Sequence, residues 1–223
     1  MSSSLVSQKE SIISSEAVTK DDQSFLTSES IITTKEQVEY NDFEILTKLF
    51  GGAMGNTFLV RHKYTGVLYV MKRVDYLDEN DKKIADEEIA QMRRLASRYT
   101  IRLVWTFVDR EDKYIVSEYC SHGDLRKLIG EFQTLPEVER LELVLELFAQ
   151  IILGLEFIHS MGIIHRDIKP ANIFIMEDGS VRLGDFGLSK ILKQKEYGSV
   201  AGTQYYMAPE VYIEGKCEDV FQQ

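Results

Sequence analysis

The chain is short of cysteine, of long apolar runs and of basic residues, and each shortage excludes a class of protein. Its two cysteines, Cys120 and Cys217, are far apart and show no metal-binding spacing, which argues against a disulfide scaffold or a zinc module. No run approaches the ~18 apolar residues of a membrane-spanning helix, and the amino terminus lacks a secretion signal. We therefore expect an intracellular protein of a reducing compartment, first of all cytoplasmic, with the nucleus or cytoskeleton as alternatives.

The net charge of the chain excludes further classes of binding partner. The 223 residues contain 26 Lys and Arg against 36 Asp and Glu, a net charge of −10. This sign is wrong for binding a nucleic-acid backbone, so we expect neither a nucleic-acid nor a membrane partner. An acidic surface steers basic molecules instead. The sequence does not indicate an oligomeric state.

Residues 1–39 differ in composition from the rest of the chain. Ser and Thr recur there without helical or strand periodicity, and Trp and Tyr are absent. Such a segment buries too little apolar surface to offset the entropy of ordering it. We interpret it as a disordered tail, and composition alone leaves open whether it is a plain linker or a regulatory phosphorylated segment.

Residues 40–120 have the pattern of a small sheet with one helix. Alternating apolar residues from Phe43, a glycine-bearing turn and the run 57–60 predict a hairpin, and residues 67–71 predict a third strand. Apolar residues at helical intervals predict an amphipathic helix over about 82–95. Two more strands are predicted at 101–108 and 113–119.

Residues 121–223 are predominantly helical in pattern. Helices are predicted at Leu125 to Phe132 and from about Glu137 to His159. The second has a broad apolar stripe typical of a core helix, formed by Leu141, Val144, Leu147, Phe148, Ile151, Ile152, Leu155 and Ile158. A strand-rich half followed by a helical half predicts an α+β fold with two lobes and a cleft near Cys120.

The chemistry-bearing residues cluster after the long helix. The sequence reads His-Arg-Asp-Ile-Lys-Pro-Ala-Asn over residues 165–172, then Asp-Phe-Gly over 185–187 and Ala-Pro-Glu over 208–210. This series resembles the catalytic loop, metal-binding triplet and activation-segment end of eukaryotic protein kinases, in the family's order. The resemblance implies the bilobal kinase fold, ATP and Mg²⁺ as cofactors, and a protein substrate.

The resemblance also assigns catalytic and metal-binding roles. Asp167 is the expected acceptor of the substrate hydroxyl proton, and Lys169 is expected to contact the migrating phosphoryl group. Lys72 is expected to contact the α- and β-phosphates and to pair with Glu88. The neighbouring Glu87 is the alternative partner, about 100° around the helix. The expected magnesium ligands are Asn172 and Asp185, whose oxygen atoms are the hard donors that this ion prefers.

The nucleotide-binding residues follow from the same alignment. Phe50 replaces the first glycine of the phosphate-binding loop, while Gly52 and Gly55 keep their places. The substitution suggests reduced ATP affinity. Ser117 occupies the gatekeeper position and should open a rear cavity, and Cys120 is expected to be an inert thiol. The expected adenine-binding residues are Thr57, Val70, Glu118, Tyr119, Cys120 and Phe174.

Two features indicate which branch of the kinase family the chain resembles and how it is regulated. Lys169, together with Thr203 in the Gly-Thr-Gln-Tyr-Tyr-Met segment, resembles the pattern of the serine/threonine branch of the family. The sequence of these motifs is most similar to that of the NIMA-related kinases. Ser199 aligns with an activation-loop phosphorylation site, for which Arg166 is the expected partner, forming charge-assisted hydrogen bonds. The alternative is a loop serine that is never modified.

The family's fold continues beyond the residues present here. Asp219 and Phe221 resemble the start of its central helix, and the sequence ends at Gln223. We therefore expect an incomplete C-terminal lobe and low stability. Two functions remain open, an ATP-dependent protein serine/threonine kinase and a catalytically weak or inactive relic that acts as a scaffold.

Overall fold

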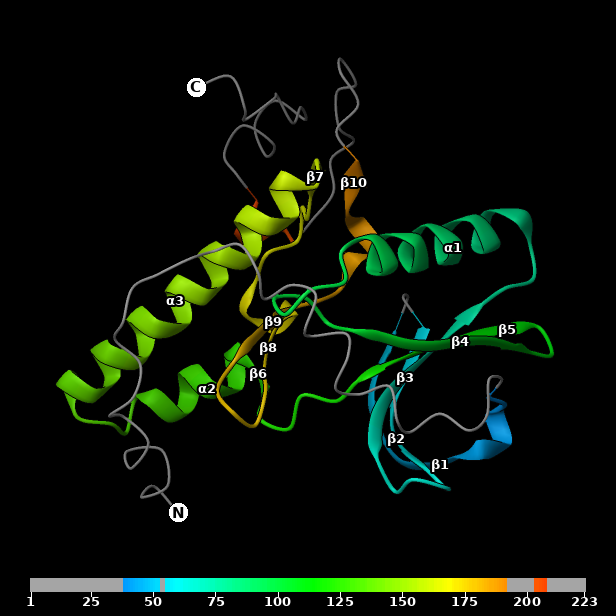
Figure 1. The fold of residues 1–223 in the computed structure, drawn as a ribbon, viewed down its shortest axis with the longest axis horizontal. Helices are drawn as coiled ribbons and strands as arrows, with labels where there is room; N and C mark the ends of the chain where they lie inside the picture. The colour runs from blue at the N-terminus through cyan, green and yellow to red at the C-terminus, as the bar shows by residue number, and fades with distance from the viewer. Residues whose placement is uncertain (1–37, 53–54, 192–202, 208–223) are drawn as a thin grey trace, which may run out of the picture. The chain divides into compact units, whose positions relative to one another are not determined.

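The first half of the chain forms a five-stranded antiparallel sheet. The computed structural model describes residues 38–52, 55–191 and 203–207. The sheet order is β1-β2-β3-β5-β4, and α1 (Glu79–Arg94) connects β3 to β4 (Figure 1). The strands are β1 (Phe43–Gly52), β2 (Gly55–His62), β3 (Leu68–Asp75), β4 (Leu103–Asp109) and β5 (Asp112–Glu118). We call this part the N-lobe, and it has the strands and the helix that the sequence predicts.

Helix α1 is determined by its ends and by one buried face. The Asp78 carboxylate accepts hydrogen bonds from the N–H groups of Asn80 and Asp81, which caps the first turn. Acidic residues in the first turn and arginines in the last both complement the helix dipole. The buried residues are Ala85, Glu88, Ile89 and Met92. This spacing places Glu88 on the side of the helix that packs into the protein.

The second half, the C-lobe, contains two helices and two small sheets in its described residues. The helices are α2 (Leu125–Phe132) and α3 (Glu137–Ser160), close to the predicted bounds. One sheet has the order β6-β8-β9, and the other pairs β10 with β7 (Figure 1). The strands are β6 (Gly123–Asp124), β7 (Ile163–Ile164), β8 (Ile173–Ile175), β9 (Val181–Leu183) and β10 (Lys190–Ile191). None of the helices in the described residues has the length and apolar character needed to cross a bilayer.

The folded region begins earlier than the sequence suggests. Val38 is 8% exposed and joins an apolar cluster with Phe43 and Tyr114. The next residue, Glu39, exchanges hydrogen bonds with Asp42 that cap a 3₁₀ turn. Both residues lie in the predicted tail of 1–39, so that boundary is wrong by two residues. The rest of the tail lies outside the described residues.

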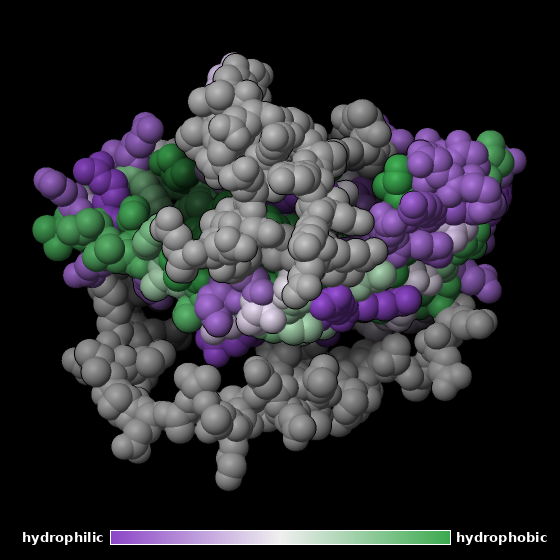
Figure 2. All heavy atoms as spheres, turned by 90° about the horizontal axis from the view of Figure 1, so that it is seen from above, coloured by the Kyte–Doolittle hydropathy of each residue, from purple (hydrophilic) through white to green (hydrophobic). Residues whose placement is uncertain are grey.

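Helix α3 is buried on a narrower face than its apolar stripe predicts. Leu147 and Ile158 are buried, and Ile151 and Leu155 pack partly against the core. Figure 2 shows apolar surface at the left of the view, the side on which α2 and α3 lie in Figure 1. The exposed members of the stripe are Leu141, Val144, Phe148 and Ile152. The prediction of a core helix is therefore correct for one side of α3 and wrong for the other.

Gly184 allows the two lobes to approach closely just before the Asp-Phe-Gly triplet. A Cβ at this position would lie 2.8 Å from Ile101 Cγ1 and 2.9 Å from a ring carbon of Phe174. We predict that Gly184→Ala lowers the free energy of unfolding by about 1–3 kcal/mol, because packed side chains must move. Urea unfolding measures the loss.

A matched glycine in an open position provides the control for Gly184. Gly130 lies in α2, and a Cβ there would meet nothing within 4 Å. Gly130→Ala should therefore stabilise the protein by about 0.5–1 kcal/mol through helix propensity. Equal effects from the two substitutions would contradict the packing argument.

Candidate active site

The candidate site lies between the two lobes, and its N-lobe side, the upper wall, carries a buried ion pair. Lys72 on β3 donates from Nζ to both carboxylate oxygens of Glu88, at 2.7 Å and 2.8 Å. The two side chains are only 20% and 9% exposed, so solvent screens the pair little. Glu87 is exposed, as its position around the helix predicts. The prediction that Glu88 rather than Glu87 meets Lys72 is confirmed.

The C-lobe side of the site, the lower wall, is organised around the Asp167 carboxylate. Lys169 donates from Nζ to Asp167 Oδ2 at 2.6 Å and to Thr203 Oγ1 at 2.7 Å. Thr203 donates its hydroxyl and its backbone N–H to Asp167 Oδ1, at 2.6 Å and 3.0 Å. Asn172 adds a hydrogen bond from Nδ2 to Asp167 Oδ2 at 2.9 Å. Thr203 therefore bridges Asp167 and Lys169.

These contacts keep Asp167 ionised. Burial acts to raise the pKa of Asp167, but the hydrogen bonds from Lys169, Thr203 and Asn172 and the charge of Lys169 outweigh it. The pKa therefore lies below its ordinary value. A group with this shift stays a carboxylate at neutral pH and can accept a proton.

The Asp-Phe-Gly triplet is held by contacts between the lobes. Asp185 has a left-handed backbone conformation, with φ of 65°. Phe186 is buried, and its ring centroid lies 5.1 Å from that of His165. Phe186 also shares a core cluster with Met92, against which Leu103 packs. Met92, Leu103, His165 and Phe186 thus belong to one packed region that spans both lobes.

His165 is neutral at this position. Burial lowers its pKa, although the Gly184 carbonyl and nearby carboxylates act in the opposite direction. Its Nε2 lies 3.0 Å from the Gly184 carbonyl oxygen. Because a carbonyl only accepts, Nε2 carries the proton in this contact. His165 therefore positions the chain just before Asp185 and does not supply a charge.

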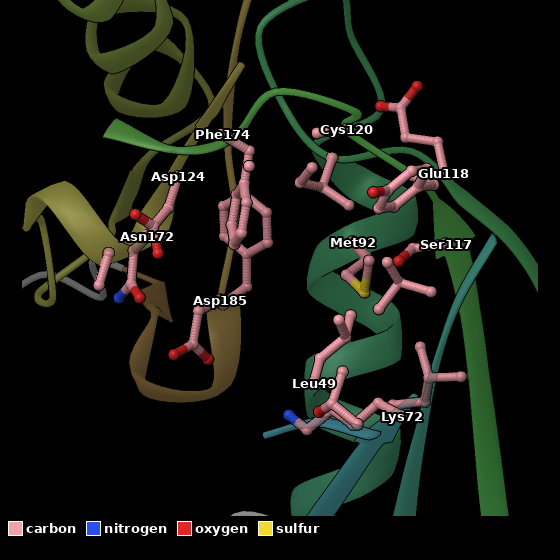
Figure 3. A pocket seen from close by; sticks show the side chains of 18 of the residues that line it. Leu49, Lys72, Met92, Ser117, Glu118, Cys120, Asp124, Asn172, Phe174 and Asp185 are labelled. Carbon is pink, nitrogen blue, oxygen red and sulfur yellow. The ribbon is translucent and has the colours of Figure 1, made fainter. Parts of the chain in front are cut away.

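A cavity of about 760 Å³ lies between the two walls. Figure 3 shows Asn172, Asp185 and Asp124 on one side of it, and Lys72, Ser117 and Glu118 on the other. The cavity size is typical of sites for small molecules and cofactors. The lining residues that the sequence predicts are Thr57, Val70, Lys72, Glu88, Ser117, Glu118, Tyr119, Cys120, Lys169, Asn172, Phe174 and Asp185.

Some predicted site residues are not placed in the cavity. Gly52 and Gly55 pair with each other at the end of the β1–β2 hairpin. Their contact with phosphate stays a prediction. Ser199 lies outside the described residues. Arg166 has a positive φ of 65° and donates from Nε to the Leu188 carbonyl at 2.6 Å, so its role toward Ser199 also stays a prediction.

Sequence reasoning missed several lining residues. Leu49 on β1 and Ile101 before β4 line the cavity, as does Asp124, which caps α2 by accepting from the Lys127 N–H. Leu49 belongs to an alternating apolar pattern just before the glycine turn, and Asp124 directly precedes an apolar helical run. Both signals were available, but each is also typical of ordinary packing or capping.

The donor set of the lower wall suits a magnesium ion. Asn172 uses its Nδ2 on Asp167, which leaves the amide oxygen as a ligand, and Asp185 contributes a carboxylate. Magnesium is commonly bound through one or two protein oxygens together with water and substrate phosphates. The residues therefore fit this ion, and Asn172 and Asp185 are the ones that would hold it.

Cys120 has the properties of an inert thiol. It is 5% exposed, and burial, followed by the charge of Glu118, raises the pKa to about 12. Because the thiolate is the nucleophile, we predict that iodoacetamide at pH 8 alkylates Cys120 at least a hundredfold more slowly in the folded protein than in urea. Peptide mapping measures the label at this residue. Equal rates in the two states would contradict the assignment.

Comparison with known proteins agrees with this geometry. Residues 43–220 match the protein kinase domain family. Over 76% of the chain, identity is 34% to serine/threonine-protein kinase Nek6 of Oryza sativa subsp. japonica and 35% to serine/threonine-protein kinase Nek2 of Homo sapiens. Identity is 28% over 91% of the chain to the probable serine/threonine protein kinase IREH1 of Arabidopsis thaliana.

The relatives are longer proteins than this chain. The matched regions cover 32% of Nek6, 40% of Nek2 and 18% of IREH1. The Nek matches agree with the expected similarity to NIMA-related kinases, while serine/threonine-protein kinase pakH of Dictyostelium discoideum is equally similar, at 35% identity. The family match spans most of the chain, and the paired lysine and the aspartate network are those that the family motifs predict. The chain belongs to the protein kinase family.

Proposed function

We propose that the protein is an ATP-dependent serine/threonine kinase that transfers the γ-phosphate to protein hydroxyls. The observation that carries this proposal is the arrangement of two charged networks around one cavity. Lys72, held by Glu88, lines it from the N-lobe, and Lys169, bound to Asp167 and Thr203, lines it from the C-lobe. Phosphoryl transfer depends mainly on such positioning and on neutralising phosphate charge.

Each network has a separate task in this chemistry. The Asp167 carboxylate orients the substrate hydroxyl and accepts its proton, and its lowered pKa keeps it in the ionised form that this role needs. Lys169, which links Asp167 to Thr203, neutralises charge on the phosphoryl group in transfer. Lys72 binds the α- and β-phosphates and is fixed in place by Glu88. Magnesium held by Asn172 and Asp185 would neutralise further phosphate charge.

The proposed hydroxyl class follows from Thr203 and Lys169. Their mutual hydrogen bond, and those that both make to Asp167, close one side of the carboxylate. This arrangement resembles the serine/threonine branch, and the similar proteins Nek6, Nek2 and pakH are named serine/threonine kinases. We therefore propose serine and threonine side chains of proteins as the acceptors.

A phosphate-transfer assay tests the proposal. The purified chain is incubated with Mg²⁺ and γ-labelled ATP and a mixture of unstructured test proteins, and phosphoamino-acid analysis follows. Label on serine or threonine, absent with Asp167→Asn, is the expected result. Nucleotide binding without label above the Asp167→Asn background would reject catalysis and favour the scaffold alternative.

A further inference from the structure

A second buried ion pair joins the two lobes behind the cavity, apart from the proposed catalytic groups. Arg182 on β9 approaches Glu118, the last residue of β5, with 3.4 Å between Nε and Oε1. The side chains are 10% and 12% exposed. Breaking a pair this buried leaves a charge with little water around it, so the pair has a strong preference for staying closed.

Each partner is anchored within its own lobe. Glu118 Oε1 accepts a hydrogen bond of 2.8 Å from the Arg102 N–H, and Oε2 lies 3.9 Å from Arg102 Nε. Arg182 donates from Nη1 to Ser180 Oγ and to the Val181 carbonyl, both at 3.1 Å. Because each charged group is held in place within its own lobe, the ion pair couples the position of one lobe to that of the other.

The pair joins two segments that line the nucleotide cavity. Glu118 lines it and is followed by Tyr119 and Cys120, which also line it. Arg182 stands three residues before Asp185, a lining residue on the opposite wall (Figure 3). A change in the distance between Glu118 and Arg182 therefore changes the distance between the adenine end and the metal end of the cavity.

Backbone contacts near the pair also join the two lobes. The Ile101 N–H donates to the Leu183 carbonyl at 2.9 Å, and the Leu183 N–H donates to the Tyr99 carbonyl at 2.7 Å. Arg94 also crosses between the lobes, donating from Nη2 to the Met161 carbonyl at 2.7 Å. The charged pair adds a further attachment next to the chain connection, and each added attachment restricts rotation of one lobe against the other.

We propose that Glu118 and Arg182 form a positioning ion pair that holds the two lobes at the spacing that nucleotide binding requires. This inference rests on the proposed function, because it assigns the pair to the ATP site of a kinase. Neither side chain is a catalytic residue in this account. Their effect is on nucleotide affinity, through the geometry of a cavity that is lined by Glu118 on one side and by Asp185, three residues after Arg182, on the other.

A double-mutant cycle on nucleotide affinity tests the inference. The dissociation constant for the Mg²⁺ complex of the non-hydrolysable analogue AMPPNP is measured by calorimetry for wild type, Glu118→Gln, Arg182→Gln and the double variant. We expect each single substitution to raise the dissociation constant about tenfold. The dissociation constant of the double variant should be no higher than that of the single variant that binds less tightly. Arg182→Lys should recover part of the affinity, since it restores the charge.

A control pair separates positioning from a loss of stability. Arg73 and Asp112 lie 3.6 Å apart on neighbouring strands of the N-lobe sheet and bridge no lobes. Arg73→Gln and Asp112→Asn should leave AMPPNP affinity unchanged, whatever they do to the melting temperature. In a kinetic assay, Arg182→Gln should raise the KM for ATP more than it lowers kcat.

The outcomes distinguish this inference from the function on which it rests. Wild type that binds AMPPNP and transfers phosphate, with unchanged affinity in Arg182→Gln, would overturn the positioning role alone. Independent, multiplying effects of the two substitutions would overturn it as well. Wild type that binds no AMPPNP would overturn both the inference and the proposed function.

Discussion

Asp167→Asn is expected to reduce phosphate transfer by a factor of about 10²–10⁴ and to leave nucleotide affinity within about twofold. The substituted amide has the shape of the carboxylate but cannot accept the hydroxyl proton. It also loses the charge that Lys169 neutralises at 2.6 Å. Asp167 is not among the residues that line the cavity, which is why binding should be spared.

Label incorporation from γ-labelled ATP and calorimetric binding of AMPPNP measure the two quantities. Asp178 provides a matched control, because it is also a carboxylate whose pKa is lowered, chiefly by a hydrogen bond with Ser180, in a turn outside the cavity. Asp178→Asn should leave transfer unchanged. Retained transfer in Asp167→Asn, or equal losses in both variants, would contradict the role given to Asp167.

Lys72→Met is expected to lower both activity and stability. Transfer should fall by about a hundredfold or more, because no cation then meets the α- and β-phosphates. The free energy of unfolding should fall by about 2 kcal/mol, since Glu88 is left 9% exposed without the ammonium that is now 2.7 Å away. Urea unfolding and label incorporation measure the two effects.

A second substitution separates the two roles of this pair. In Lys72→Met combined with Glu88→Leu, the unpaired carboxylate is removed and an apolar pair fills the site, so stability should return toward that of wild type. Activity should not return, because the phosphate-binding charge is still missing. Recovery of activity in the double variant would show that Lys72 acts only in packing.

The sequence was most informative where chemistry requires a residue type at a fixed spacing. The motifs around Asp167 and Asp185 identified residues from distant segments that the fold brings to one cavity. Helical spacing, together with the family resemblance, distinguished Glu88 from Glu87, because two neighbouring residues lie about 100° apart around the helix. The five strands of the N-lobe and the helices α1, α2 and α3 were likewise predictable from their periodicity, whereas the short strands of the C-lobe were not predicted.

Other features depend on contacts that no local pattern records. The burial of Val38 depends on an aromatic cluster built from several strands, so the polar composition of residues 1–39 gave no sign of it. The stripe on α3 indicates an apolar face, but the pattern cannot say which side meets β9 and the core. The pairing of Glu118 with Arg182 joins residues 64 positions apart through the relative placement of two sheets. Tertiary geometry determines all three.

The central claim is that one magnesium–nucleotide complex binds between Lys72 on the N-lobe and Asp185 on the C-lobe. Calorimetric titration of the chain with AMPPNP, with and without Mg²⁺, tests it most directly when Lys72→Met and Asp185→Asn are titrated in parallel. We predict saturable binding of one nucleotide that depends on Mg²⁺, weakened in both variants, with the Mg²⁺ dependence lost only in Asp185→Asn. Absence of binding to wild type, or binding unchanged in both variants, would contradict the account.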